Sequence, residues 1–192
     1  MIMGELDWIT NIAKVFKGQA RVLLYYAGHG IPDESSRDAY LLPVDGTGNN
    51  TTTAIKLSNI YSRLNENPTE STVVFLDACF SGAQRNGQML AQARGVAIKA
   101  KAERPAGSIV VFSAASGDET AYPYNEKGHG LFSYYLMKKL QDSRGEATLG
   151  QLAVYISDNV SQQAIVQNAK SQTPTVVPSV DMGEKWKTIK LK

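Results

Sequence analysis

The sequence predicts a single α/β domain built on a mainly parallel sheet, and three apolar segments carry this prediction. Residues 21–27, 72–78 and 108–113 are rich in β-branched, aromatic and other apolar side chains, and small residues or glycine follow each of them closely. Continuous apolar runs of this length are typical of strands that are covered on both faces. Helical patterns lie between these runs, and strand–helix alternation favours an α/β sandwich over all-α or all-β architectures.

Four segments place apolar residues at the three- and four-residue spacing of an amphipathic helix: residues 5–17, 54–64, 131–140 and 149–166. Thr148 is the expected N-cap of the last helix, because a threonine hydroxyl accepts a hydrogen bond from the first helical turn. Residues 83–107 interrupt the alternation with glycine, proline and basic side chains. We expect an exposed connecting segment there, between a first part at residues 1–82 and a second at 108–192.

Composition excludes several classes of protein. The chain has 192 residues, of which 43% are hydrophobic and 20% charged, as in one globular domain. Its 20 basic and 18 acidic side chains give a net charge of +2, which predicts no nucleic-acid partner. No apolar run approaches the roughly 20 residues that span a bilayer. No signal peptide is visible either, so we expect no membrane partner and favour a cytoplasmic location.

The residues that could carry chemistry follow two of the predicted strands. Cys79, the only cysteine, follows the strand at 72–78, and His29 follows the strand at 21–27. The carboxyl ends of parallel strands meet at one edge of a sheet, where imidazole can activate a thiol as a nucleophile. With one cysteine and two histidines the chain can form neither an intrachain disulfide nor an ordinary structural zinc site. The residues alone leave open whether Cys79 is catalytic or a buried structural cysteine.

Five motifs extend the argument, because in order and content they resemble those of the caspase and metacaspase family, in its bacterial form. The histidine motif lies at residues 25–30 and the cysteine motif at 75–82; the others lie at 40–45, 113–122 and 128–136. The resemblance covers roughly residues 5–170. It implies a caspase-like three-layer sandwich with a mainly parallel sheet, and a cysteine endopeptidase that needs no cofactor.

The resemblance also assigns roles. It implies His29 and Cys79 as the catalytic dyad, with the backbone N–H groups of Gly30 and Cys79 as the oxyanion hole. In metacaspase-like relatives, the acid two positions before the cysteine lies in the pocket for the residue before the cleaved bond. Here that acid is Asp77, so we expect a polypeptide substrate cleaved after Arg or Lys. The alternative is that Asp77 is a structural acid that accepts hydrogen bonds from backbone amides.

Other residues have candidate roles in the same scheme. Ala27, Asp118 and Glu119 are further candidates for the substrate pocket. With a basic specificity, the connecting segment offers candidate self-cleavage sites at Arg85, Arg94, Lys99, Lys101 and Arg104. The alternative is that these charges only keep an exposed segment soluble. A calcium site, known in some metacaspases, has the candidate carboxylates Asp33, Asp38 and Asp45 but no dense cluster. We expect a capping or surface role for His129.

The chain departs from the family pattern at its start, because the usual opening strand, helix and second strand are missing. The strand at 21–27 should then have an unpaired apolar edge, through which the chain could associate with itself. The main alternative to a peptidase is therefore an inactive caspase-like module that binds partners through this edge. A third alternative is a hydrolase or transferase that uses the same dyad on a non-peptide acyl group.

Overall fold

The computed structural model describes residues 2–46, 51–81, 100–101, 103–117 and 119–192, and its centre is a four-stranded sheet in the order β1-β5-β6-β9. The strands are β1 (Arg21–Ala27), β5 (Ser71–Asp77), β6 (Ile109–Ser113) and β9 (Thr175–Pro178). β1 pairs in parallel with β5 and β5 with β6, whereas β9 runs antiparallel to β6. The predicted mainly parallel sheet is confirmed. The antiparallel strand β9 had not been predicted.

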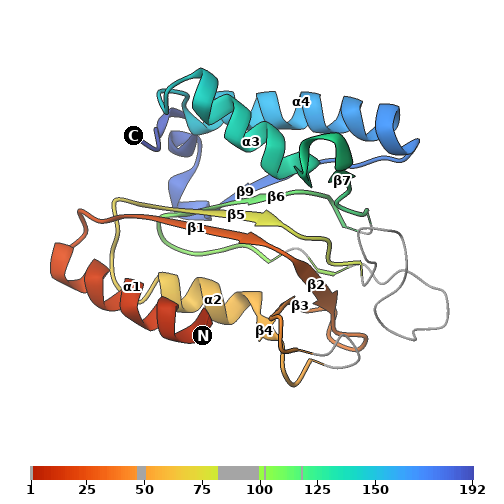
Figure 1. The fold of residues 1–192 in the computed structure, drawn as a ribbon. Helices are drawn as coiled ribbons and strands as arrows, with labels where there is room; N and C mark the ends of the chain where they lie inside the picture. The colour runs from red at the N-terminus through yellow and green to blue at the C-terminus, as the bar shows by residue number, and fades with distance from the viewer. Residues whose placement is uncertain (1, 47–50, 82–99, 102, 118) are drawn as a thin grey trace.

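Helices cover both faces of the sheet, which gives three layers (Figure 1). One face carries α1 (Ile2–Phe16) and α2 (Leu57–Leu64), and the other carries α3 (Leu131–Asp142) and α4 (Leu149–Asn168). The predicted cap of α4 is confirmed: the Thr148 hydroxyl accepts a hydrogen bond from the Gln151 N–H, and the Gln151 side chain accepts one from the Thr148 N–H. Such a capping box satisfies two N–H groups that the helix itself leaves unpaired.

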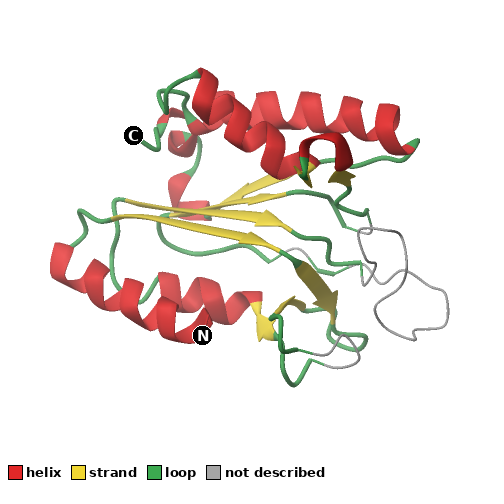
Figure 2. Cartoon of the chain, in the orientation of Figure 1, coloured by secondary structure: helices red, strands yellow, loops and turns green. Residues whose placement is uncertain are grey.

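Short strands lie at one end of this core (Figure 2). β2 (His29–Pro32), β3 (Ala39–Leu42) and β4 (Ile55–Lys56) form a small antiparallel sheet in the order β2-β3-β4, and β7 (Pro123–Tyr124) pairs with β8 (His129–Gly130). The described residues also include the 3₁₀ helices η1 (Asn125–Lys127), η2 (Val180–Met182) and η3 (Lys185–Thr188). The helix expected at 54–64 begins only at Leu57, because Ile55 and Lys56 pair with β3.

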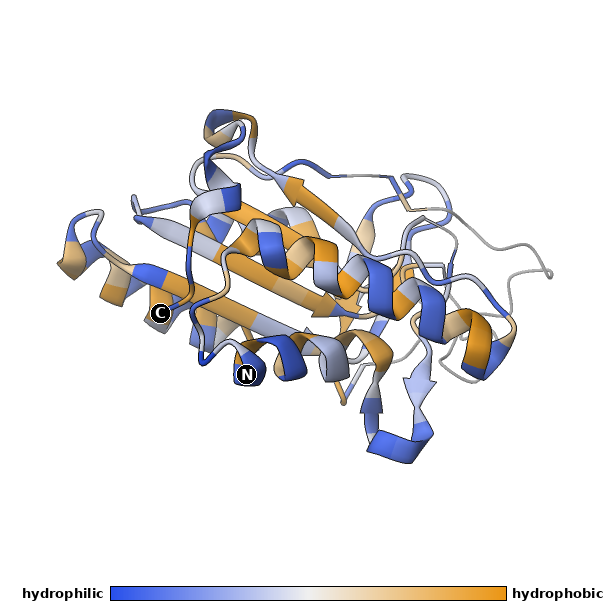
Figure 3. Cartoon of the chain, turned by 90° about the horizontal axis from the view of Figure 1, so that it is seen from above, coloured by the Kyte–Doolittle hydropathy of each residue, from blue (hydrophilic) through white to orange (hydrophobic). Residues whose placement is uncertain are grey.

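Burial along the sheet corrects one expectation. β5 is buried at every position and β6 at all but its last, so these two strands are covered on both faces as predicted. β1 instead alternates between exposed and half-buried residues, and Leu23 and Tyr25 keep 51% and 48% of their surfaces exposed. The reason is its position, since β1 is the terminal strand of the sheet. Viewed from above, apolar residues concentrate on the strands and the helix faces that meet them (Figure 3).

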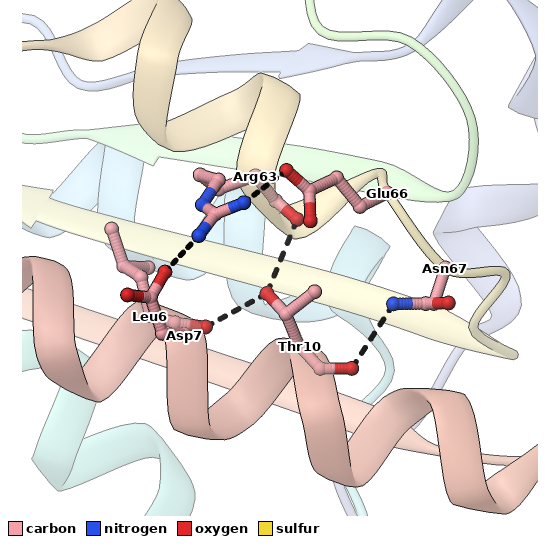
Figure 4. Close-up of polar contacts among 6 residues, drawn as sticks. All are labelled: Leu6, Asp7, Thr10, Arg63, Glu66 and Asn67. Atoms are coloured by element: carbon pink, nitrogen blue, oxygen red, sulfur yellow. Dashed lines mark hydrogen bonds and ion pairs between the residues drawn. The ribbon is translucent and has the colours of Figure 1, made fainter.

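Polar contacts fasten α1 to α2 beneath the sheet (Figure 4). Thr10 donates its hydroxyl hydrogen to Leu6 O at 2.7 Å, with Arg63 O a second acceptor at 3.3 Å, and Asn67 Nδ2 donates to Thr10 O at 3.1 Å. The Arg63 guanidinium joins the two helices through an ion pair with Asp7. These contacts fix α1 against the body of the domain. None of the described helices is both long and apolar enough to cross a membrane.

Candidate active site

The ends of β1 and β5 lie side by side, which brings the histidine and cysteine motifs together. The two strands pair in register as far as Ala27 and Asp77, and the Gly28 N–H then donates a hydrogen bond to Asp77 O at 3.2 Å. A Cβ atom built on Gly30 would lie 2.7 Å from Cys79 O. Real Cβ atoms do not approach a backbone oxygen this closely, so only glycine fits at position 30. The backbone beside His29 therefore contacts the backbone of Cys79.

Cys79 itself is buried, with 1% of its surface exposed. It belongs to the apolar cluster between the sheet and α3 and α4, together with Phe75, Phe112 and Leu131. A cysteine in such surroundings is held firmly by packing, as expected for either a nucleophile at a strand end or a structural residue.

His29 lies at the start of β2, opposite Leu42 of β3. The Tyr26 hydroxyl, at the end of β1, lies 2.8 Å from His29 O and 2.9 Å from Leu42 O, and so ties β1 to this hairpin. Among the described residues, the buried Nδ1 of His29 has no hydrogen-bond partner. Nothing in the described part of the chain therefore fixes this ring nitrogen as a hydrogen-bond donor or acceptor. The other histidine, His129, is exposed in β8, in agreement with the expected surface role.

An open cleft of about 1010 Å³ lies beside His29. It is bounded by the end of β1, the loop that follows β3, and the first residues of α1. Its wall is mainly apolar, with Leu42, Pro43 and Ile55 among the lining residues, and Asp45 is the one acidic residue among those described there. The cleft thus lies on the side of the sheet that α1 and α2 cover.

Asp77 points to the opposite side, toward the N-terminus of α3. Its Oδ2 accepts a hydrogen bond from the Ser133 hydroxyl and another from the Ser133 N–H at 3.3 Å. The Tyr25 hydroxyl in turn lies 2.5 Å from Ser133 Oγ. A Cβ atom on Gly130, the N-cap of α3, would approach within 2.9 Å of the Asp77 Cγ atom. Asp77, with 1% of its surface exposed, is therefore a buried acid at the positive end of a helix.

The other candidate pocket residues have different surroundings. Ala27 pairs with Asp77 but lines the cleft beside His29. The Glu119 carboxylate accepts hydrogen bonds from Ser116 Oγ at 3.0 Å and from the Thr173 N–H at 2.6 Å. These bonds tie the loop after β6 to the segment that enters β9. Asp118 lies outside the described residues.

The described end of the connecting segment is anchored to the domain. Lys101 pairs with the buried Asp38 carboxylate, and its N–H donates to Arg37 O at 2.8 Å. Asp38 also pairs with Lys56 Nζ at 2.6 Å. Both lysines, Lys101 more strongly than Lys56, lower the pKa of Asp38 well below its usual range. Burial raises the pKa of the neighbouring Glu103. Of the candidate cleavage residues, Arg104 is exposed, and Arg85, Arg94 and Lys99 lie outside the described residues.

Two of the calcium candidates, Asp33 and Asp38, have local partners. The Asp33 carboxylate accepts hydrogen bonds from the N–H groups of Ser35 and Ser36, at 3.1 and 2.8 Å, which lower its pKa. In the part of the chain that the structure describes, no group of three or more His, Cys, Asp or Glu side chains is arranged to hold a metal ion.

Sequence reasoning missed the roles of Ser133 and Tyr26, whose side chains form hydrogen bonds with residues of the candidate site. Ser133 is the third residue of α3, three positions after Gly130, where a side chain can reach an acid placed at the helix end. Tyr26 sits inside an apolar run. The long-range pairing of its hydroxyl with Leu42 O has no local sequence signal.

Comparisons with known proteins agree with this fold. Residues 4–181 match the model of the Caspase domain family. Among solved structures, the Geobacter sulfurreducens protein GSU0716 superposes with a TM-score of 0.65 at 18% identity, covering 97% of this chain and 76% of that chain. Caspase-1 from Spodoptera frugiperda superposes with a TM-score of 0.55 at 15% identity, covering 92% of this chain and 67% of that chain. The search of curated proteins found no match.

Proposed function

Because the chain belongs to the Caspase domain family, whose members are cysteine peptidases acting on polypeptides, we propose that it is an endopeptidase with Cys79 as nucleophile and His29 as acid–base partner. One observation carries the proposal: the ends of β1 and β5 are joined by the Gly28–Asp77 hydrogen bond, and the residues that follow them are in contact. The buried Nδ1 of His29, which lacks a partner among the described residues, supports a role in proton transfer.

The chemistry then follows in two steps. The Cys79 thiolate attacks the carbonyl carbon of the scissile bond, forming a C–S bond while the carbonyl oxygen becomes an oxyanion held by the N–H groups of Gly30 and Cys79. The C–N bond breaks as His29 gives its proton to the leaving amine. Water next attacks the thioester carbonyl carbon while His29 takes one of its protons. The C–S bond then breaks, which releases the product as a carboxylic acid and restores the Cys79 thiolate beside the protonated His29.

We further propose that Asp77 selects Arg or Lys before the cleaved bond. A buried carboxylate favours a cationic side chain and disfavours an acidic one. Asp77 accepts hydrogen bonds from Ser133 in the absence of substrate, so the binding of a cationic side chain would exchange or extend these bonds. The competing explanation, a purely structural acid at the end of α3, fits the same contacts. Only an activity measurement separates the two.

Self-processing within the connecting segment remains a proposal. Lys101 is held by Asp38 and by its backbone bond to Arg37, so cleavage there requires the segment to detach first. Arg104 is exposed but is followed by Pro105, whose nitrogen carries no hydrogen and is held in a ring. We therefore expect Arg85, Arg94 and Lys99 to be cut before Lys101 or Arg104. Mass spectrometry of incubated wild-type and Cys79→Ala protein tests this order.

A fluorogenic peptidyl-Arg substrate tests the main proposal. Cleavage by the wild type and none by Cys79→Ala is expected, whereas no cleavage by either would favour an inactive module. An acyl ester that is turned over while peptides are not would instead favour the non-peptide hydrolase or transferase. A peptidyl-Arg electrophile that labels Cys79 would count against that alternative.

A second candidate function is partner binding or self-association through the edge of β1. The observation in its favour is that β1 ends the sheet with Leu23 and Tyr25 about half exposed. A cavity of about 610 Å³ adjoins this edge, and exposed Trp8 and Phe16 of α1 line it. A Leu23→Lys change places a charge on the edge strand, which blocks strand addition. We expect it to abolish any concentration-dependent association seen by sedimentation; association that persists would contradict this role.

A further inference from the structure

The cleft beside His29 lies on the side of the sheet opposite to Asp77. Its walls come from the end of β1, from the loop after β3 and from the start of α1, whereas Asp77 bonds to Ser133 of α3. Helices α1 and α3 lie on opposite faces of the sheet (Figure 1). A polypeptide that crosses the strand ends between them would thus have different surroundings before and after its scissile bond.

This arrangement fixes the direction of the bound chain if the proposed function holds. The side chain before the scissile bond must face Asp77, and the leaving amine must lie beside His29, which protonates it. The residues that follow the leaving nitrogen therefore continue past His29, along the wall formed by Gly28 and Leu42. They enter the cleft on the α1 side.

The chemistry of the cleft indicates which residues it accepts. Pro43, Val44 and Ile55 give it apolar contacts, and its volume of about 1010 Å³ is at the upper end of the roughly 300–1,000 Å³ of sites that enclose small ligands. It can therefore take roughly two or three residues. Asp45 is exposed and is the only charged residue among the described lining, so it attracts basic side chains and repels acidic ones.

We propose that this cleft is the binding site for the segment of substrate after the cleaved bond, and that it selects apolar or basic residues and rejects acidic ones there. The inference rests on the proposed peptidase function. It adds a second specificity element, Asp45, on the opposite side of the sheet from Asp77. The occupant is the leaving polypeptide, because His29 at the border of the cleft is the residue that must protonate its amine.

The test uses the full chain and quenched peptides with a fixed Arg before the cleaved bond. The second residue after the bond is Lys, Leu, Gly or Asp, and a peptidyl-Arg coumarin substrate lacks this segment altogether. We expect kcat/KM for the Leu peptide to exceed that for the Gly peptide by up to about tenfold, because the cleft partly buries the Leu side chain. We expect kcat/KM for the Lys peptide to exceed that for the Asp peptide by up to about fivefold. The effect is no larger because the Asp45 carboxylate is exposed to solvent.

Asp45→Lys should reverse the preference between Lys and Asp, and Asp45→Asn should remove it. Asp158→Lys is the matched control, since Asp158 is an exposed carboxylate on α4, on the other face of the domain, and should keep the wild-type preference. Thermal melts identify any variant that does not fold. If the coumarin substrate is still cleaved, either of two results would overturn the inference. The preference between Lys and Asp could survive both Asp45 changes, or the rates could be independent of the residue after the bond. No cleavage of the coumarin substrate would overturn the peptidase function and this inference with it.

Discussion

Replacing Asp77 with Asn removes one buried negative charge while keeping the size of the side chain. In the structure this charge accepts two hydrogen bonds from Ser133 at the N-terminus of α3. A charge in a partly buried position at a helix end contributes up to about 2 kcal/mol. A hydrogen bond to a charged group exceeds a neutral one by about 1 kcal/mol. We therefore expect Asp77→Asn to lower the free energy of unfolding by about 1–3 kcal/mol, or the Tm by about 2–12 °C.

The effect on specificity should be larger if Asp77 also pairs with substrate. Breaking a buried ion pair by removing one partner costs about 3–5 kcal/mol, which corresponds to a factor of roughly 10² to 5 × 10³. The assay compares kcat/KM for peptidyl-Arg and peptidyl-citrulline substrates, which have nearly the same shape but differ in charge. Their ratio is independent of how much of each variant is folded. Wild type should favour Arg strongly, and Asp77→Asn should lose that preference.

Ser133→Ala is the matched control for this prediction. It removes the hydroxyl that lies between Asp77 and Tyr25 but leaves the carboxylate in place. We expect a loss of stability of about 1 kcal/mol with the preference for Arg retained. An Asp77→Asn protein that melts lower but still favours Arg as strongly as the wild type would refute the specificity role. Asp77 would then be a structural residue of α3 alone.

Two further predictions concern the neighbouring backbone and the anchored segment. Gly30→Ala puts a Cβ atom against Cys79 O. We therefore expect the variant to be destabilised by about 1–3 kcal/mol and its kcat/KM to fall at least tenfold. A fully active and equally stable variant would contradict the proposed contact between the two motifs. Burial and the neighbouring Asp38 raise the pKa of Glu103, whereas Lys56 and Lys101 act to lower it. The contribution of Glu103 to stability is therefore present below its unfolded pKa and is lost as the pH rises through its folded pKa. Glu103→Gln should therefore raise the Tm at pH 7 but not at pH 4, and an equal change at both values would show that ionisation of Glu103 is not responsible. Below about pH 4 the unfolded chain takes up a proton at Asp38 that the folded protein does not, because Lys101 and Lys56 lower the folded pKa of Asp38, so both proteins should lose stability alike as the pH falls further.

The strong periodic segments were predictable from sequence, because their side chains alone determine which face is buried. β1 was predicted with its observed bounds, β5 and β6 to within one residue, and the cap of α4 through Thr148. The sequence did not predict the short strands β2, β3 and β9, because whether a four-residue segment forms a strand depends on its pairing with other segments of the chain. The burial of β1 was predicted wrongly, because the exposure of a strand depends on its place in the sheet and not on its own apolar side chains.

The site was predictable at the level of motifs and not at the level of contacts. The approach of the histidine and cysteine motifs follows from parallel strands ending at one edge, which the sequence indicates through its apolar runs. The hydrogen bonds of Asp77 to Ser133 and of Tyr26 to Leu42 O join elements that are distant in sequence. The ion pair of Lys101 with Asp38 is likewise a tertiary contact between two segments that each look like solvated surface.

The central claim is that His29 acts on the thiol of Cys79, and the most direct measurement is the rate at which a peptidyl-Arg electrophile alkylates the protein. Cys79 is the only cysteine, so the mass of one adduct per chain reports that thiol alone. We predict that wild type reacts at least about a hundredfold faster than His29→Gln at pH 7 and keeps reacting at pH 6, because a neighbouring imidazolium stabilises the thiolate. Equal alkylation rates in wild type and His29→Gln across this pH range would contradict the account.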